Sequence, residues 1–120
     1  MDILGITMWR EARGVGEEGM RAVYHVIHNR STDRRWRKDM EEVCLQPFQF
    51  SCWNTTDLQR DLYPTPTDPL YLKAMSIIDD PGQDPTGGAN TYYDSSITAP
   101  SYDTPKTFKC QIGKLRFHEL

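Results

Sequence analysis

The chain has 120 residues, of which 38% are hydrophobic and 26% charged, and this is typical of one soluble globular domain rather than two. Its net charge of −3 argues against a broad nucleic-acid-binding surface, so the basic stretch 33–38 is interpreted as an exposed helix start. No stretch approaches the roughly 20 apolar residues of a membrane span, and the first residues lack the pattern of a signal peptide. Stable membrane insertion is therefore not expected.

The N-terminal part predicts helices. Residues 2–12 form the first, with Asp2 as its cap, and two glycines then break the chain. Residues 17–31 predict the central helix of the fold, because glutamates open it and apolar residues follow at helical spacing. A shorter helix is predicted over 36–44. The side chains expected to face inward from these two helices are Met20, Ala22, Val23, Val26, Ile27, Arg30, Trp36, Met40 and Val43.

The second half changes character along the chain. Residues 45–66 are predicted to be mostly irregular, with a short extended piece as an open alternative within them, and 68–79 to form a fourth helix. Dense turn residues then lead into a predicted strand over 89–94 and a hairpin over 107–120, whose tight turn is at Gly113. The sequence therefore predicts an α+β fold over residues 1–120, with a helical N-terminal portion and a small C-terminal β element.

Cysteines and histidines give weak signals. The odd number of cysteines, Cys44, Cys52 and Cys110, cannot close into a full set of disulfides, so free, semi-buried thiols are predicted, with a Cys44–Cys52 pair as the alternative. His25 and His28 have a spacing that can serve a metal, but no spacing supplies the further ligands. We predict partly exposed histidines, no metal site and no cofactor.

Glu11 is the residue that raises a chemical question. It lies near the C-terminal end of the first predicted helix, where the helix dipole raises the pKa of a carboxyl group. Nearby aromatic residues would raise it further by desolvation, whereas Arg10 and Arg13 would lower it if they paired with Glu11. A raised pKa suits a general acid for glycosidic cleavage, and a surface glutamate is the alternative.

Two later segments could contact a sugar. The segment "QPFQFSCWN" interleaves aromatic and amide side chains, which suits a saccharide groove as well as an aromatic core loop. In "DPTGGANTYY", a glycine turn precedes Tyr92 and Tyr93, which must point to opposite faces of a strand, one of them toward the core or cleft.

Four blocks in order resemble one known family. The stretch "EARGVGEEGMRAVYHVIHNR" resembles the signature of the SleB-type cell wall hydrolases, the spore cortex-lytic group that includes phage endolysins. The resemblance continues through "VCLQPFQFSCWN", "DPTGGANTYY" and "IGKLRFHEL". This family is similar to lytic transglycosylases and the lysozyme-like fold. The resemblance implies cleavage of the β-1,4 bond between N-acetylmuramic acid and N-acetylglucosamine, with Glu11 as proton donor.

The chain departs from the family pattern at two places. Val15 stands where the family often has a second glutamate, and Trp9-Arg10 stand where it often has Tyr-Gly. The loss of a second carboxylate favours a lytic transglycosylase, in which Glu11 alone serves as acid and base and the product has a 1,6-anhydro end. The candidates for binding the sugar are Gln49, Ser51, Trp53, Thr86, Tyr92 and Tyr93.

Three alternatives stay open at this point. A hydrolytic muramidase would need a second carboxylate, for which the sequence offers Glu17, Glu18 and Asp84. A peptidoglycan-binding phage structural protein would keep the fold without turnover. A wall amidase or peptidase would depend on a thiol.

The resemblance also implies a biological role. We expect a monomeric phage endolysin that acts on peptidoglycan glycan strands, accumulates in the host cytoplasm, and reaches the periplasm and cell wall after a holin opens the membrane. A virion-associated wall-degrading protein is the alternative.

Overall fold

The computed structural model describes residues 2–36, 38–46, 50–53 and 61–120. Its elements, in chain order, are α1 (Ile3–Ala12), the 3-10 turn η1 (Arg13–Val15), α2 (Gly16–Thr32), α3 (Met40–Leu45), the 3-10 turn η2 (Ser51–Trp53), α4 (Pro69–Asp79), β1 (Thr91–Asp94), β2 (Phe108–Ile112) and β3 (Leu115–His118). None of the helices in these ranges has the length and apolar character needed to cross a bilayer.

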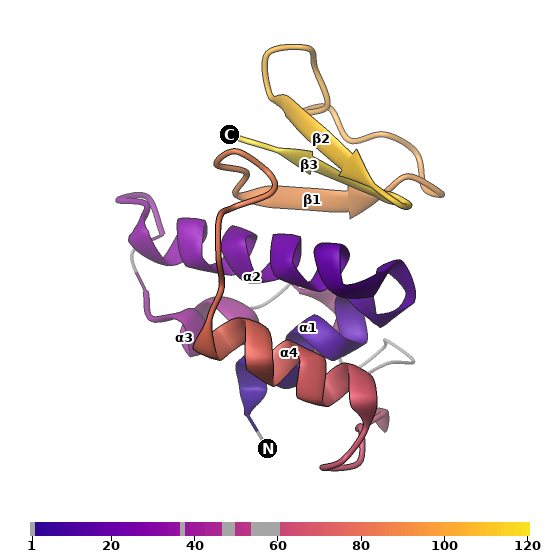
Figure 1. The fold of residues 1–120 in the computed structure, drawn as a ribbon. Coiled ribbons are helices and arrows are strands. Elements are labelled where there is room, and N and C mark those ends of the chain that lie inside the picture. Colours follow the sequence, from indigo (N-terminus) through magenta and orange to yellow (C-terminus); the bar gives the residue numbers. More distant parts are fainter. Residues whose placement is uncertain (1, 37, 47–49, 54–60) are drawn as a thin grey trace.

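Helix α2 is the centre of the fold. It lies between the small sheet on one side and α1, α3 and α4 on the other (Figure 1). The predicted apolar stripe is buried, because Met20, Val23 and Ile27 are each 0% exposed and belong to the main hydrophobic cluster. Arg30 continues the stripe as a buried cation that donates from Nη1 to the carbonyl of Asn90 at 2.8 Å. The helix thus ties the helical layer to the segment that enters the sheet.

Aspartate caps fix where three of the helices begin. The side chain of Asp2 accepts from the backbone N–H of Gly5 at 3.0 Å, as predicted for the first helix. Asp68 caps α4 in the same way, with its Oδ1 accepting from two backbone N–H groups at 2.9 and 3.1 Å. Such caps satisfy donors that the first helical turn leaves without a partner.

The prediction for the third helix was wrong at its start. α3 begins at Met40 rather than at residue 36, because Asp39 caps it by accepting from the N–H of Glu42 at 2.8 Å. Residues 34–36 form a turn, and Lys38 and Asp39 are not helical, so the described part of the basic stretch 33–38 does not begin a helix. Trp36 lies beside two guanidinium groups, with the Cζ of Arg30 3.9 Å and that of Arg35 4.2 Å from its ring centroid.

The sheet is antiparallel, with strand order β1-β3-β2. The predicted hairpin is present, and Gly113 has φ of 57° in its turn, a conformation that favours glycine. Tyr92 of β1 pairs with Phe117 of β3, and Tyr93 pairs with Arg116. Because neighbours on a strand point to opposite faces, Tyr92 and Phe117 share the inner face toward the helices, while Tyr93 and Arg116 share the outer face.

The predicted irregular region 45–66 does not show the short extended piece in the part around residues 51–53. In its described part, residues 51–53 form a 3-10 turn rather than an extended piece. Phe50 is 2% exposed and packs in the main core cluster, so for this residue the core alternative holds.

Candidate functional site

Glu11 lies in the last turn of α1, half-buried, directly before the turn η1. That turn is packed tightly by Val15. A Cβ atom at Gly19 of α2 would lie 2.2 Å from Val15 Cγ2, and one at Gly113 of the hairpin would lie 2.8 Å from Val15 Cγ1. The two glycines therefore provide the space that Val15 fills between α2 and the hairpin, and this contact fixes the chain that follows Glu11.

Tyr92 brings the sheet to Glu11. Its hydroxyl donates to Glu11 Oε1 at 2.9 Å, which joins β1 to the end of α1. The Tyr92 ring packs between Phe50 and Phe117, at centroid distances of 6.2 and 5.3 Å. Burial raises the pKa of Tyr92 well above 10, and the nearby charge of Glu11 and the hydrogen bond to it add to this shift. Tyr92 therefore keeps its proton and remains a donor to Glu11.

A polar turn places β1 in position for this contact. The carboxylate of Asp84 accepts from the N–H and hydroxyl of Thr86, at 2.8 and 2.6 Å, and from the N–H of Gly88 at 3.0 Å. Asn29 of α2 donates to Asp84 at 3.0 Å and to the carbonyl of Ala89 at 2.8 Å. Burial acts to raise the pKa of Asp84, but these donors together lower it. Asp84 is thus an ionised anchor for the turn.

The two arginines that flank Glu11 bind backbone carbonyls and aromatic rings. Arg10 is 4% exposed and donates from Nε to the carbonyl of Leu62 at 2.9 Å and from Nη1 to that of Cys52 at 3.2 Å. Arg13 donates to the carbonyls of Trp9 and Arg10, at 3.2 and 3.3 Å, and lies 4.0 Å from the Trp9 ring centroid. These contacts fix the helix end around Glu11.

The structure brings some of the predicted sugar-binding residues together and separates others. Tyr92 meets Glu11, and Trp53 is half-buried beside α1, where its Nε1 donates to Thr7 Oγ1 at 2.7 Å. Thr86 is 3% exposed and bonded within its turn, and Tyr93 lies on the other face of the sheet. Gln49 lies outside the described residues, as does the side chain of Ser51.

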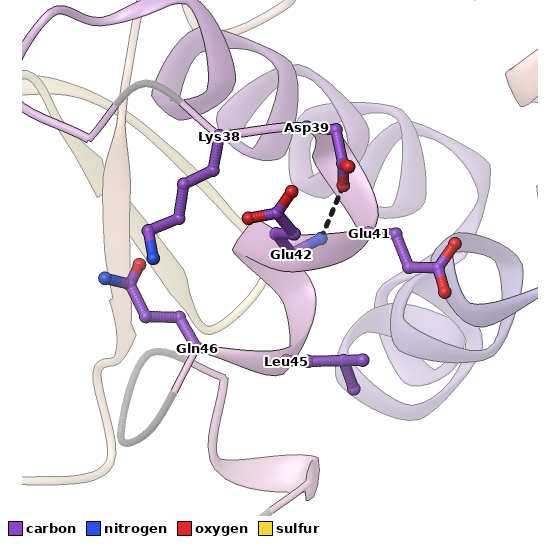
Figure 2. Close-up of a pocket in the computed structure, with 6 residues that line it drawn as sticks. All are labelled: Lys38, Asp39, Glu41, Glu42, Leu45 and Gln46. Carbon is purple, nitrogen blue, oxygen red and sulfur yellow. Dashed lines mark hydrogen bonds between the residues drawn. The ribbon is translucent and has the colours of Figure 1, made fainter.

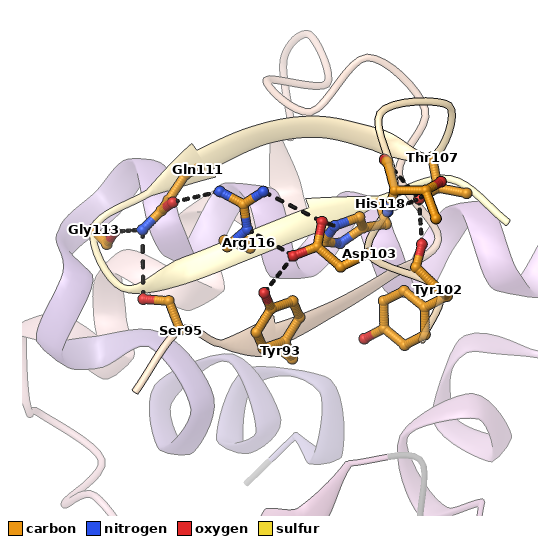
Figure 3. Close-up of polar contacts among 10 residues, drawn as sticks. Tyr93, Ser95, Tyr102, Asp103, Thr107, Gln111, Gly113, Arg116 and His118 are labelled. Carbon is orange, nitrogen blue, oxygen red and sulfur yellow. Dashed lines mark hydrogen bonds and ion pairs between the residues drawn. The ribbon is translucent and has the colours of Figure 1, made fainter. Parts of the chain in front are cut away.

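Tyr93 belongs to a second polar network, which sequence reasoning missed. Figure 3 shows the Asp103 carboxylate between Tyr93, Arg116 and His118, which bond to it at 2.5, 3.1 and 2.8 Å. Arg116, and then Tyr93 and His118, hold the pKa of Asp103 well below its usual range. His118 is 0% exposed. The network attaches the segment 95–107, which carries Asp103, to the outer face of the sheet.

The described thiols and histidines do not form a metal site. Cys44, Cys52 and Cys110 are not joined by disulfides, and burial raises the pKa of Cys44 to about 12 and raises that of Cys110, so these two thiols resist ionisation. Contrary to the prediction, His25 is buried, with Nε2 3.3 Å from the carbonyl of Pro81. Across the residues that the structure describes, no three histidine, cysteine or acidic side chains are grouped to hold a metal ion.

The predicted second carboxylates have other partners or lie exposed. Glu17 forms ion pairs with Arg21 at 3.0 Å and with Lys73 at 3.7 Å, and the hydrogen bond from Arg21 is the largest cause of its lowered pKa. Glu18 is exposed, and Asp84 holds its turn.

A hollow of about 460 Å³ lies beside α3, away from these contacts (Figure 2). It is open and polar, and Asp39 in its wall serves as the cap of α3. The residues that line it are Lys38, Asp39, Glu41, Glu42, Leu45 and Gln46.

Comparison with known proteins identifies the family. A sequence model described as Cell Wall Hydrolase matches residues 14–118. The chain belongs to the cell wall hydrolase family. The predicted SleB-type membership is thus confirmed. The matched span begins after Glu11, so the family match assigns no role to Glu11.

Two solved structures resemble this cell wall hydrolase closely. The catalytic domain of the Bacillus cereus SleB protein has a TM-score of 0.75 and 26% identity, over 98% of this chain and 87% of that one. The catalytic domain of the germination-specific lytic transglycosylase SleB from Bacillus anthracis has a TM-score of 0.74 and 26% identity, over 98% and 91%. None of the curated proteins matches the chain. The predicted lysozyme-like α+β fold is confirmed.

Proposed function

We propose that this cell wall hydrolase is a peptidoglycan glycosidase that cleaves the β-1,4 bond between N-acetylmuramic acid and N-acetylglucosamine, as a lytic transglycosylase with Glu11 as its single acid and base. One observation carries the proposal: the 2.9 Å hydrogen bond from Tyr92 holds a half-buried carboxyl group at the end of α1. The similarity to a SleB domain described as a lytic transglycosylase supports the reaction type.

The hydrogen bond assigns different tasks to the two oxygens of Glu11. Tyr92 keeps its proton because burial raises its pKa, so its hydroxyl donates to Oε1. A protonated carboxyl group has one carbonyl oxygen and one hydroxyl oxygen, and the carbonyl oxygen is the better acceptor. With Oε1 accepting from Tyr92, the transferable proton is on Oε2.

The reaction then balances without water or a cofactor. Glu11 Oε2 donates its proton to the glycosidic oxygen as the bond from that oxygen to muramic acid C1 breaks, which leaves an oxocarbenium-like centre at C1. The Glu11 carboxylate next takes the proton of the muramic acid C6 hydroxyl while O6 forms a bond to C1. The products are a free N-acetylglucosamine hydroxyl and a 1,6-anhydro-muramic end, and Glu11 is protonated again.

The partner of Glu11 suits both of its protonation states, because a neutral phenol hydroxyl can donate to a carboxyl group and to a carboxylate. The hydrogen bond from Tyr92 becomes charge-assisted once Glu11 has given up its proton, and it stabilises the carboxylate that must act as base.

The surroundings favour one acid over two. Glu17 is paired with Arg21 and Lys73, and Asp84 is bonded within its turn. Val15, where the family often has a glutamate, is packed against Gly19 and Gly113. For the sugar, Trp53 and Tyr92 are the proposed contacts with described positions beside α1. Gln49 and Ser51 stay predictions, and Thr86 and Tyr93 act through the turn and the sheet.

The biological role that we propose is that of a phage endolysin. The protein would accumulate as a monomer in the host cytoplasm and reach the glycan strands of the cell wall once a holin opens the membrane. Induced expression tests this role: rapid lysis is expected only when a holin is expressed together with the protein, and lysis without a holin would contradict it.

Analysis of the products tests the reaction. Purified sacculi are digested with the wild type and with Glu11→Gln, and the soluble fragments are analysed by mass spectrometry. We expect anhydro-muramic ends from the wild type and a loss of about 10²- to 10⁴-fold in the variant, the usual effect of removing a general acid. Circular dichroism of both proteins controls for folding.

Results other than anhydro-muramic ends made only by the wild type would support one of the alternatives. Reducing muramic ends would indicate hydrolysis with a second carboxylate or a held water. Full activity of folded Glu11→Gln would remove Glu11 from the mechanism, and no cleavage by the wild type would support a binding or structural role. Loss of activity on alkylation of the cysteines would support the thiol alternative, against which the raised pKa of Cys44 argues.

A further inference from the structure

Arg10 is a buried cation that contacts two aromatic rings at once. It is 4% exposed, and its Cζ lies 4.3 Å from the ring centroid of Trp53 and 4.5 Å from that of Tyr63. A guanidinium at such distances is attracted to the ring electrons, more strongly when water is excluded. Arg10 directly precedes Glu11 in α1, so both rings are attached to the helix that carries the proposed acid.

Arg10 contacts the two rings in the same way: in each case it also bonds to the backbone carbonyl of the residue before the ring. Nη1 donates to the carbonyl of Cys52, the residue before Trp53, and Nε donates to the carbonyl of Leu62, the residue before Tyr63. Each ring is therefore held twice, through its own contact with the guanidinium and through the peptide group that precedes it. Trp53 has a further bond, from Nε1 to Thr7 Oγ1 at 2.7 Å.

Tyr63 combines this fixed support with high exposure. It is 60% exposed, the largest value among the exposed large hydrophobic residues in the described part of the chain, although its ring contacts Arg10. Tyr63 therefore offers surface to solvent while its contact with Arg10 restricts its orientation, and a restricted side chain loses less entropy on binding.

We propose that Tyr63, held by the same guanidinium as Trp53, forms an aromatic subsite that binds an N-acetylhexosamine of the glycan strand outside the bond that is cleaved. This inference rests on the proposed function, because it assumes that the substrate is a glycan. The C–H face of a pyranose ring packs on an aromatic ring, and tyrosine and tryptophan can also hydrogen-bond to its hydroxyl and acetamido groups. Arg10 is a positioning residue that acts through the two rings.

The subsite has a kinetic signature because it contacts a sugar remote from the reacting bond. Binding energy from such a sugar favours the bound strand and acts on Kd and KM, and it is gained only by strands long enough to reach the ring. A tyrosine that only stabilises the fold would change the melting temperature instead, with the same Kd for short and long strands.

Binding without turnover gives the direct test. In the Glu11→Gln background, isothermal titration calorimetry measures Kd for purified strands of alternating N-acetylglucosamine and N-acetylmuramic acid of increasing length. Adding Tyr63→Ala should weaken the binding of long strands by about tenfold, the effect of losing one ring contact, and of the shortest strands much less. Tyr63→Phe, which keeps the ring, should stay within about twofold.

Two further variants provide matched controls. Leu72→Ala removes another exposed apolar side chain, which is 50% exposed on α4, and should leave Kd unchanged. Arg10→Lys keeps the charge but loses the planar fork that bonds to two carbonyls and contacts two rings, so it should reproduce the loss seen with Tyr63→Ala. Thermal melts accompany every variant.

The outcomes separate the subsite from the proposed function. Equal Kd for Tyr63→Ala and its parent at every strand length would overturn the subsite, as would a loss that does not depend on length. If the wild type cleaves sacculi and Tyr63→Ala does so with unchanged KM, the subsite fails and the glycosidase stands. If the wild type neither binds nor cleaves glycan strands, both fail.

Discussion

Two consecutive tyrosines of β1 make the same contact on opposite faces of the sheet, with different consequences. Tyr92 points inward and donates to Glu11, whereas Tyr93 points outward and donates to Asp103. Asp103 also accepts hydrogen bonds from Arg116 and His118. It stays ionised because these donors hold its pKa far below the usual range. The donor to Glu11 is the neutral hydroxyl of Tyr92, whose raised pKa means that it keeps its own proton.

The difference shows what separates a structural carboxylate from one that can transfer a proton. A guanidinium paired with a carboxylate makes protonation costly over the whole physiological range, which suits an anchor such as Asp103. A phenol hydroxyl orients a carboxyl group in either protonation state without adding a charge. The inner face of the sheet therefore suits the proposed chemistry, and the outer face suits attachment of the segment 95–107.

The first prediction compares the two tyrosines directly. Tyr92→Phe removes the donor to Glu11 but keeps the ring, and it should lower kcat by about tenfold to a hundredfold because the acid loses its orientation. Tyr93→Phe should lower kcat less and the melting temperature more. Steady-state cleavage of sacculi, with melting curves of both variants, measures this. A larger loss of kcat from Tyr93→Phe would reverse the assignment of the two faces.

The second prediction removes the structural carboxylate. Asp103→Asn leaves Arg116 without its ionised partner and should lower the melting temperature by about 5 °C or more, while folded protein keeps its KM. Asp94→Asn is the matched control on the same strand as Tyr93, since Asp94 pairs with Lys114 at 3.4 Å near the surface. A melting temperature for Asp103→Asn no lower than that of Asp94→Asn would show that the outer network contributes little.

The turn after Glu11 gives the third prediction. Gly19→Ala places a methyl group where Val15 Cγ2 lies, so it should destabilise the fold by about 1–2 kcal/mol and reduce activity by displacing that turn. Gly14→Ala meets no atom within 4 Å and serves as the control in the same region. Urea unfolding and sacculus cleavage are measured for both. Equal behaviour of the two variants would mean that the Val15 contact does not fix the turn.

The fourth prediction concerns acid. The pKa of Asp103 is lower in the folded chain than in the unfolded chain, where it is about 3.9. Its contribution to stability is therefore complete above that value and is lost as pH falls below it toward the folded pKa. Stability measured between pH 7 and pH 2 should fall more steeply below about pH 4 in the wild type than in Asp103→Asn. Parallel curves would contradict this linkage.

The smallest effect is expected at Glu17. Its ion pairs with Arg21 and Lys73 are exposed, and exposed pairs contribute little. Glu17→Gln should leave both the melting temperature and the product pattern unchanged. A loss of cleavage by the folded variant would instead identify Glu17 as a second catalytic carboxylate.

The sequence predicted best what depends on local interactions. The cap at Asp2, the stripe of α2 and the turn at Gly113 all follow from residues close in the chain. The predicted start of the third helix was wrong because Asp39, which caps the helix, lies inside the predicted range 36–44.

The candidate site was predictable only in part, because its contacts join distant segments. Strand alternation places Tyr92 and Tyr93 on opposite faces but cannot say which face meets α1, since that depends on how the sheet packs. Asp103 was missed because the segment that carries it has no periodic pattern. The alternation of Arg116 and His118 on one face of β3 was the available signal for a polar network there.

The pairing of β1 with β3 fixes the number of residues between Asn90 and Tyr92. Asn90 fixes the start of β1, since its N–H donates to the carbonyl of His118 at 2.9 Å and its side chain bonds to both backbone groups of Leu120. A single residue inserted between Asn90 and Tyr92 would shift the register by one, so Tyr92 would point to the outer face and lose its contact with Glu11. Libraries that diversify this enzyme should therefore vary side chains here and keep the spacing unchanged.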